Sequence, residues 1–464
     1  MTMKLNEFDF NGFRLKRHRS GFGRSLACAA LLLFGTGLSA QTWLTSDRIR
    51  TFDEVKVLNS IIRDIDGENR LVLDEGYGSS YFIKVDDTNG YVPALGLPED
   101  IRVRDFTIHE GTVYFCGYKV VTFHDTVPVF GWFGLEGFPS VSVSCATPIF
   151  HKSFERMGLY TIPEGEGQLH FALVARRHDN KFTLVDACIT PDNKFRYHYM
   201  ENPEELTSHY IDDLVVTDNY VVVSSRTREP YTPTGYLWCF EKPYAPGAHM
   251  FSVAAHRCPL GTVAPSRIIL EKLGRTSLYY NAYVALYSGQ KVEQFSLFMS
   301  EFDGIYHGCT RKLATPYAHA TFKGVMYNPE DPLLSVVVDV WPNLFIGPHH
   351  HVVYTMSLGS CGGSGGSVKG YLLEEEEVHS LTYLRGRLLN ETCGTRYGTL
   401  RLNTYDGLQG DCLSRVGGQI MEMEKRYKYD ITPCDAFYNE AQVGGLPTTE
   451  TSFRITTECE TRYY

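Results

Sequence analysis

Pairs of carboxylates are the residues of this chain with the most obvious capacity for chemistry. Glycoside cleavage uses two carboxyl groups roughly 5–10 Å apart, one acting as an acid and the other as a base or nucleophile. Asp212 with Asp213, and Asp105 with Glu110, are two such pairs, but the chain carries 54 Asp and Glu residues in all. Because abundance does not single out two carboxylates at the required separation, the sequence assigns no catalytic residue.

A glycine-rich segment contains the letters of a serine nucleophile. Gly362-Gly363-Ser364-Gly365-Gly366 matches the Gly-x-Ser-x-Gly of a nucleophile elbow and is similar to the serine loop of chymotrypsin-like proteases. An elbow needs a strand before it and a helix after it, and a triad needs a placed His and Asp. The glycines instead stand before the acidic run 374–377, which we expect to be a solvated loop. We therefore interpret residues 362–366 as a flexible loop.

Two further segments carry the ligand types of metal sites. In His349–His351, alternation along an expected strand places the first and third imidazoles on one face, where they could chelate zinc or copper. No third or fourth ligand is visible. Residues 64–69 (DIDGEN) have the oxygen density of a calcium loop but not its spacing, so a hairpin turn explains them. No metal or cofactor is predicted.

A two-strand pattern recurs along the chain at a nearly constant step. Residues 103–117 (VRDFTIHEGTVYFCG), 211–225 and 380–394 share alternating apolar positions on either side of a turn. The seven copies have their turns near these positions: Gly67, Gly111, Gly165, Asn219, Gly274, Glu330 and Gly386. The step ranges from 44 residues (67 to 111) to 56 (330 to 386). Periods of roughly 40–55 residues built from short strands are typical of propeller blades rather than helical solenoids.

An all-β fold follows from these repeats. A third apolar strand follows each hairpin, and the best helical stretch, residues 419–428, has no apolar face worth packing. On this period and pattern the chain resembles β-propeller repeat proteins over about residues 45–405. The resemblance implies seven blades, with eight as the alternative. Because the Trp-Asp pair of WD repeats and the Ser-x-Asp-x-Gly-x-x-Trp box of sialidase-like propellers are absent, no family site is carried over.

The two ends of the chain differ from the repeats. Residues 1–40 hold a basic segment, then the apolar stretch 26–38, then Leu-Ser-Ala, which is the pattern of a secretory signal cut before Gln41. The expected domains are thus this signal, blades over 41–406, and a tail over 407–464 that closes the ring or forms a divergent last blade. We expect residues 452–458 of the tail to pair with residues 43–52, which would cover exposed strand edges of the first blade.

Charge and hydropathy narrow the classes of partner. The apolar stretch is shorter than the roughly 20 residues of a membrane span, and no later window reaches that length, so no span is predicted. Cys28 lies at the start of this stretch, in the wrong order for a lipidated cysteine. Removing residues 1–40 takes six Lys/Arg and two Asp/Glu, so the formal net charge of −10 becomes −14 (−10 − 4). Nucleic acid is therefore not an expected partner.

The cysteines fall into two groups. Cys116, Cys188 and Cys239 lie inside strand-like runs, where a small thiol is expected to be a buried core residue. Four later cysteines are disulfide candidates with three possible connectivities: Cys393, Cys412, Cys434 and Cys459.

Two functions remain open at this point. The first is a secreted or periplasmic propeller that binds or scaffolds a protein or glycan partner. The second is a carbohydrate-active enzyme with carboxylates near a central channel. The same scaffold hosts both kinds of function, so the fold does not choose between them.

Overall fold

The computed structural model divides the chain into two compact units, Met1–Thr42 and Trp43–Tyr464. Within the second unit it describes residues 46–462 apart from these connecting segments: 57–59, 66–69, 77–78, 86–89, 150, 163–167, 203–208, 217–219, 229–233, 244–246, 253, 263, 274–276, 286–290, 301–304, 315–318, 329–332, 342–349, 358–367, 374–375, 385–386, 395–398, 406–413, 417–418 and 429. All regular elements in the described residues are strands, which confirms the all-β expectation. No helix of sufficient length and apolarity to cross a membrane occurs in this part of the chain.

The strands form antiparallel meanders of four, in chain order. The first four meanders are β2 (Ser60–Asp64), β3 (Arg70–Gly76), β4 (Ser79–Val85) and β5 (Gly90–Gly96); β6 (Ile101–His109), β7 (Thr112–Val120), β8 (Thr126–Gly134) and β9 (Val143–Ala146); β10 (Ser153–Thr161), β11 (Leu169–Arg176), β12 (Phe182–Ile189) and β13 (Lys194–Asn202); and β14 (His209–Val216), β15 (Tyr220–Thr227), β16 (Thr234–Glu241) and β17 (Ala255–Thr262).

Three more meanders follow in the described part of the chain. They are β18 (Ala264–Leu273), β19 (Ser277–Ala285), β20 (Lys291–Ser300) and β21 (Ile305–Ala314); β22 (His319–Asn328), β23 (Leu333–Trp341), β24 (His350–Ser357) and β25 (Val368–Leu373); and β26 (Glu376–Leu384), β27 (Arg387–Gly394) and β28 (Thr399–Tyr405), completed by β1 (Ser46–Lys56) from the other end of the unit. Each of the seven predicted turn positions separates the first and second strands of one meander, as expected from the repeats.

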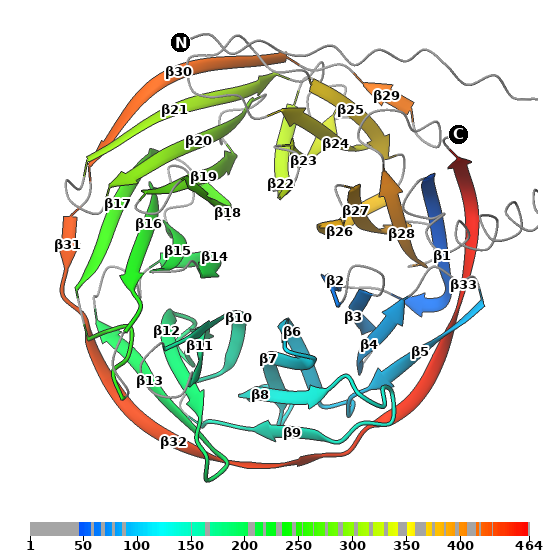
Figure 1. Cartoon of the computed structure of the whole chain (residues 1–464), viewed down its shortest axis with the longest axis vertical. Coiled ribbons are helices and arrows are strands. Elements are labelled where there is room, and N and C mark those ends of the chain that lie inside the picture. Colours follow the sequence, from blue (N-terminus) through cyan, green and yellow to red (C-terminus); the bar gives the residue numbers. More distant parts are fainter. Residues whose placement is uncertain are drawn as a thin grey trace, which may run out of the picture. The chain divides into compact units, whose positions relative to one another are not determined.

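The meanders are arranged like the blades of a propeller (Figure 1). The first strand of each meander contacts the first strand of the next, in the order β2, β6, β10, β14, β18, β22 and β26, and β26 contacts β2 again. Apolar side chains fill the space between neighbouring sheets. One such cluster joins Phe130 and Cys116 to Phe171 and Phe195 of the next meander. Where side chains are described, the second and third meanders therefore bury both faces against their neighbours, which explains the near-continuous apolar runs in their strands.

The C-terminal tail forms a second layer of pairing around the meanders. Its strands are β29 (Ser414–Val416), β30 (Gln419–Lys428), β31 (Asp430–Thr432), β32 (Asp435–Leu446) and β33 (Thr449–Arg462), and we call them the belt. They pair antiparallel with fourth strands in reverse chain order: β29 with β25, β30 with β21, β31 with β17, β32 with β13 and then β9, and β33 with β5 and then β1. Figure 1 shows the belt, in orange and red, outside these strands.

The belt corrects one expectation about the tail and confirms another. Phe52 pairs with Ile455 and Arg50 with Thr457, so the expected pairing of residues 452–458 with residues 43–52 is present. The first meander, however, is not closed by β1, because β1 is the fourth strand of the last meander. None of the five belt strands begins a sheet of its own.

Tight backbone approach explains two glycines in the second meander. A Cβ on Gly117 would stand 1.9 Å from the carbonyl oxygen of Arg102, and a Cβ on Gly131 would stand 2.3 Å from the Phe115 ring. The turn between β6 and β7 uses positive φ at Glu110 (48°) and Gly111 (73°), as a two-residue hairpin turn requires.

Among the cysteines whose side chains are described, Cys116, Cys145, Cys188 and Cys434 are free thiols. Cys116, Cys188 and Cys239 are buried, as expected, and burial raises the pKa of the Cys116 thiol well above its usual value. Cys434 is also free, which differs from its expected role in a disulfide. The side chains of the other three disulfide candidates lie outside the described residues.

Candidate functional site

The first strands share a β-bulge near their middle. One extra residue shifts the register at equivalent places in six of the described meanders: Arg104, Glu155, Asp212, Ser266, Lys323 and His379. Bulges re-aim side chains and are common beside functional sites. Where side chains are described, these bulges bring charged residues of adjacent meanders together, as in the contact between Arg104 Nε and Glu155 Oε2 at 3.8 Å.

Asp105, which follows the first of these bulges, is a structural residue. It is 5 % exposed, and its Oδ1 accepts hydrogen bonds from its neighbour Phe106 N at 2.9 Å and from Arg63 Nη2 at 3.1 Å. Its Oδ2 accepts a hydrogen bond from Met157 N of the next meander at 3.0 Å. The carboxylate thus joins the first strands β2, β6 and β10, and both of its oxygens are engaged.

The structure does not bring Asp105 and Glu110 together as an acid and base pair. Glu110 lies in the turn after β6, with its side chain 86 % exposed. Five residues of extended chain put the two carboxyl groups roughly 15 Å apart. This candidate pair is therefore wrong, because an extended strand separates residues that are near in sequence.

Asp212 and Asp213 lie together on β14 but have different environments. Asp213 Oδ1 accepts a hydrogen bond from Leu214 N at 3.0 Å, in the same way as Asp105 does from Phe106. Asp212 lies 3.1 Å from Arg226 Nε, and its Oδ2 is buried without a hydrogen-bond partner. Burial raises the pKa of Asp212 to about 7, against the opposing charge of Arg226. A carboxyl group with such a pKa can give or take a proton near neutral pH.

A buried polar cluster lies between the third and fourth meanders, and sequence reasoning missed it. Asp186 is 1 % exposed, lies 3.0 Å from His170 Nδ1, and accepts a hydrogen bond from Met250 N at 2.7 Å. The rings of His198 and His249 stack with centroids 4.2 Å apart, and burial lowers the pKa of His198 to about 4. No group of three or more His, Cys, Asp or Glu among the described residues could hold a metal ion. The cluster therefore joins two meanders, and an alignment of the repeats gives no signal for it.

The other chemical candidates fall on parts of the chain that the structure does not describe. Residues 362–366 and His349 lie outside the described residues, as do residues 66–69 of the turn and 374–375 of the acidic run. His350 and His351 begin β24, but their side chains are not described.

Large apolar side chains are exposed on loops at one end of the meanders. Val121 (58 %), Phe123 (94 %) and Ile149 (77 %) lie in the turn after β7 and in the connection from β9 to β10. Because neighbouring strands are antiparallel, these loops share one end with the turn 177–181 and the start of β14, and we call it the loop end. Thr126 Oγ1 donates a hydrogen bond to Lys152 O (2.8 Å), and Lys152 N donates one to Arg176 O (2.7 Å). These two bonds connect each loop to the next.

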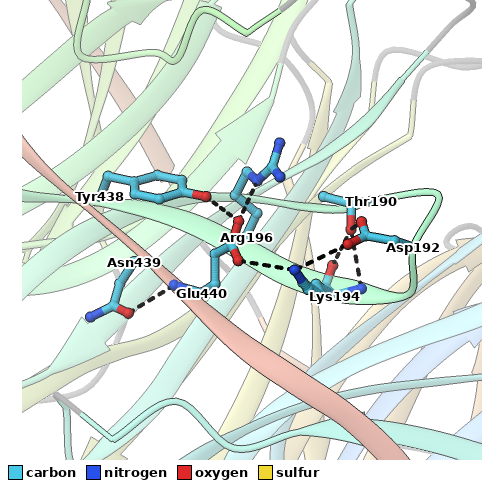
Figure 2. A network of polar contacts seen from close by, with 7 residues as sticks. All are labelled: Thr190, Asp192, Lys194, Arg196, Tyr438, Asn439 and Glu440. Atoms are coloured by element: carbon cyan, nitrogen blue, oxygen red, sulfur yellow. Dashed lines mark hydrogen bonds and ion pairs between the residues drawn. The ribbon is translucent and has the colours of Figure 1, made fainter.

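The belt is held to the third meander by a network of charges (Figure 2). Glu440 of β32 contacts Arg196 Nε at 3.0 Å and Lys194 Nζ at 3.6 Å, and it accepts a hydrogen bond from the Tyr438 hydroxyl. Asp192 lies on the other side of Lys194 at 3.1 Å. The hydrogen bond from Tyr438 is the main reason why the pKa of Glu440 lies below its usual value. The contacts with Arg196 and Lys194 lower this pKa further. The network fixes the register of the belt on β13 and leaves no free catalytic group.

No family model matches the chain, and no curated protein matches it.

Proposed function

We propose that the chain is a seven-bladed β-propeller exported to the periplasm or the cell exterior, where it acts as a binding or scaffolding module for a protein or glycan. The seven meanders would be the blades, β1 would complete the last blade, and the belt would add a fifth strand to the outside. The closed order of contacts among the first strands supports this reading.

The exposed apolar residues of the loop end carry the binding proposal. The side chain of Phe123 is almost fully exposed to water, which contributes nothing to the stability of the folded protein. Clustered exposed apolar side chains mark interaction sites. Phe123 with Val121 and Ile149 supplies aromatic and aliphatic surface on these loops, beside the polar residues Thr122, His124 and Asp125 of the same turn. That composition favours a protein partner over a glycan.

Site-specific crosslinking in the natural host would test the binding face. A photoreactive amino acid at position 123 is expected to give a discrete crosslinked species, and the same group at the exposed Tyr91 of β5 is not. Excess unlabelled wild-type protein should compete for the species, whereas V121S/F123S protein should not. Equal crosslinking from both positions, or none from position 123, would overturn the proposed face. N-terminal sequencing of the mature protein tests export, with Gln41 as the expected first residue.

Asp212 supports a second candidate, a carbohydrate-active enzyme in which this carboxyl group acts as the proton donor. Its pKa of about 7 and unpartnered oxygen are the observations in its favour. Hydrolysis of a panel of polysaccharides by wild-type protein but not by D212N would support this activity. No hydrolysis of any member by the wild type would leave the binding function alone.

A further inference from the structure

An aromatic ring at the loop end is held by two arginines. Tyr210, at the start of β14, is 42 % exposed. The guanidinium carbons of Arg226 and Arg228 lie 5.4 Å and 5.0 Å from its ring centroid, and Phe182 contacts the ring at 6.2 Å. Stacking on an aromatic ring fixes the plane of a guanidinium group before any ligand arrives. The planes of both guanidinium groups are therefore fixed beside a partly exposed ring, while the Nε atoms of Arg226 and Arg228 are buried.

The turn between β11 and β12 adds two more cations beside these arginines. Arg228 Nη2 donates a hydrogen bond to Asn180 O at 2.6 Å, which joins the end of β15 to this turn. Arg177 and Lys181 lie in the same turn, with 40 % and 49 % of their side chains exposed. We call Arg177, Lys181, Arg226 and Arg228, with Tyr210 between them, the basic patch.

The acids that the structure describes near the basic patch are fewer than its cations. Asp179 is shared, at 3.5 Å from Arg177 Nε and 4.0 Å from Lys181 Nζ. Asp212 lies 3.1 Å from Arg226 Nε, but its pKa of about 7 leaves it partly uncharged at neutral pH. Arg228 Nε is buried without a hydrogen-bond partner. Among the described residues, the four cations are matched by Asp179, by the partly protonated Asp212 and by Asp213 beside it on β14, in a chain with a net charge of −10.

We propose that the basic patch binds an acidic polysaccharide with a carboxylate on successive sugars, such as a polyuronate. Arginine forks recognise planar carboxylates through paired hydrogen bonds. The cations come from two segments, the turn 177–181 and the end of β15, around Tyr210 of β14, so one isolated carboxylate would leave most of them unused. A polymer with a carboxylate on each ring engages several of them at once. The patch contains one aromatic ring and no aliphatic residue, so it lacks the apolar centre of a protein interface.

Calorimetric titration of the full mature protein with oligogalacturonate tests the proposal. We expect saturable binding at low salt, with a neutral oligogalactan giving none. R228Q should weaken binding by about tenfold or more, and R228K by several-fold because a lysine keeps the charge but not the fork. K119Q is the matched control, since Lys119 is an exposed cation paired with Asp100 on another meander, and its affinity should be unchanged. If R228Q does not fold, R177Q/K181Q on the exposed turn takes its place.

Proton binding at Asp212 supplies a second readout. Arg226, Asp213 and Arg156 are the charged groups that act on this carboxyl. The uronate stays ionised from pH 8 to pH 6, while Asp212 gains a proton and ceases to repel it, so affinity should rise as the pH falls. D212N should bind at pH 8 as tightly as the wild type does at pH 6.

Three results would overturn the proposal. They are the absence of wild-type binding, equal binding of the neutral glycan, and full retention of affinity in both R228Q and R177Q/K181Q. Equal competition by poly-L-glutamate would also overturn it, in favour of unspecific attraction of polyanions. V121S/F123S protein should bind oligogalacturonate normally, so failure of the apolar docking face and failure of this site are distinguishable.

Discussion

Removal of the Asp105 carboxylate should destabilise the whole second unit. Asp105→Ala leaves the buried N–H groups of Phe106 and Met157 without their acceptor, and each such group costs about 1–3 kcal/mol. Arg63 also loses this partner, but it keeps the hydrogen bond from its Nε to Phe106 O at 3.2 Å, and its side chain is 38 % exposed. We therefore expect a loss of about 3–5 kcal/mol in the free energy of unfolding, with Asp105→Asn between Ala and the wild type because one acceptor oxygen remains.

Thermal unfolding followed by circular dichroism measures this loss. The unfolding entropy of roughly 2 cal/mol/K per residue gives about 0.9 kcal/mol/K for the residues of Trp43–Tyr464, so the Tm should fall by about 4–5 °C. Arg63→Gln is the matched control, expected to cost about 1 kcal/mol or less. A drop for Arg63→Gln as large as that for Asp105→Ala would show that the ion pair, and not the main-chain hydrogen bonds, carries the stability. No measurable drop for Asp105→Ala would refute the reasoning altogether.

Three further outcomes are expected. Gly117→Ala should lower the free energy of unfolding in urea by several kcal/mol, because its Cβ would meet the Arg102 main chain. Gly134→Ala, with nothing within 4 Å of its Cβ, should change stability by less than about 1 kcal/mol. Similar costs at both sites would contradict the close approach at Gly117. Cys116 should react with iodoacetamide only as fast as the protein unfolds, because the thiol is fully buried and its pKa is raised, and rapid labelling in the native state would place its strand outside the core. A chain ending at residue 406 lacks the belt and so leaves fourth-strand edges of all the meanders unpaired; it should aggregate or melt earlier than the full chain, and an unchanged Tm would make the belt dispensable.

The repeat pattern predicted the meanders because their stability depends on side chains. The alternation of apolar and polar residues in segments such as 112–116 reflects burial against neighbouring sheets, so this burial can be recognised in the sequence. The belt is different, since its strands are added by main-chain hydrogen bonds to the outer edges of the sheets. Segment 435–446 has largely exposed or half-exposed side chains. Strand addition at a sheet edge selects few particular side chains. The sequence of residues 419–428, which form β30, therefore suggested only a poor helix.

The structural carboxylates Asp105 and Asp213 could have been recognised in the sequence, but they were interpreted there as candidate acid and base groups. Asp105 and Asp213 occupy the same place in the aligned repeats, and both accept a hydrogen bond from the next main-chain N–H. Recurrence at one place in a repeat favours a structural role over an acid and base pair. The neighbouring Asp212 differs because the bulge at its position and the burial of its carboxyl depend on the packing of whole sheets. No local sequence pattern predicts that environment.

Two buried histidines should make the protein lose stability in mild acid. His151 and His209 are 2 % and 4 % exposed, and burial lowers the pKa of each to about 4, whereas an unfolded histidine titrates near 6.5. Their contribution is complete above pH 6.5 and is lost as the pH falls towards 4, because only the unfolded chain binds the two protons in this window. Between pH 6 and pH 5 this amounts to about 2 kcal/mol.

Comparison of slopes isolates this effect from the other titrating groups. Asp212 acts in the opposite direction, since its raised pKa makes the folded state bind a proton as the pH falls, and the carboxylates with lowered pKa values act mainly below pH 5. The free energy of unfolding of H151F/H209Q should therefore fall by about 2 kcal/mol less than that of the wild type between pH 6 and pH 5. His124→Gln, at an exposed position, should leave the wild-type slope unchanged. Equal slopes for the double variant and the wild type would show that both rings take up protons without unfolding, and hence that they are reached by water in the native state.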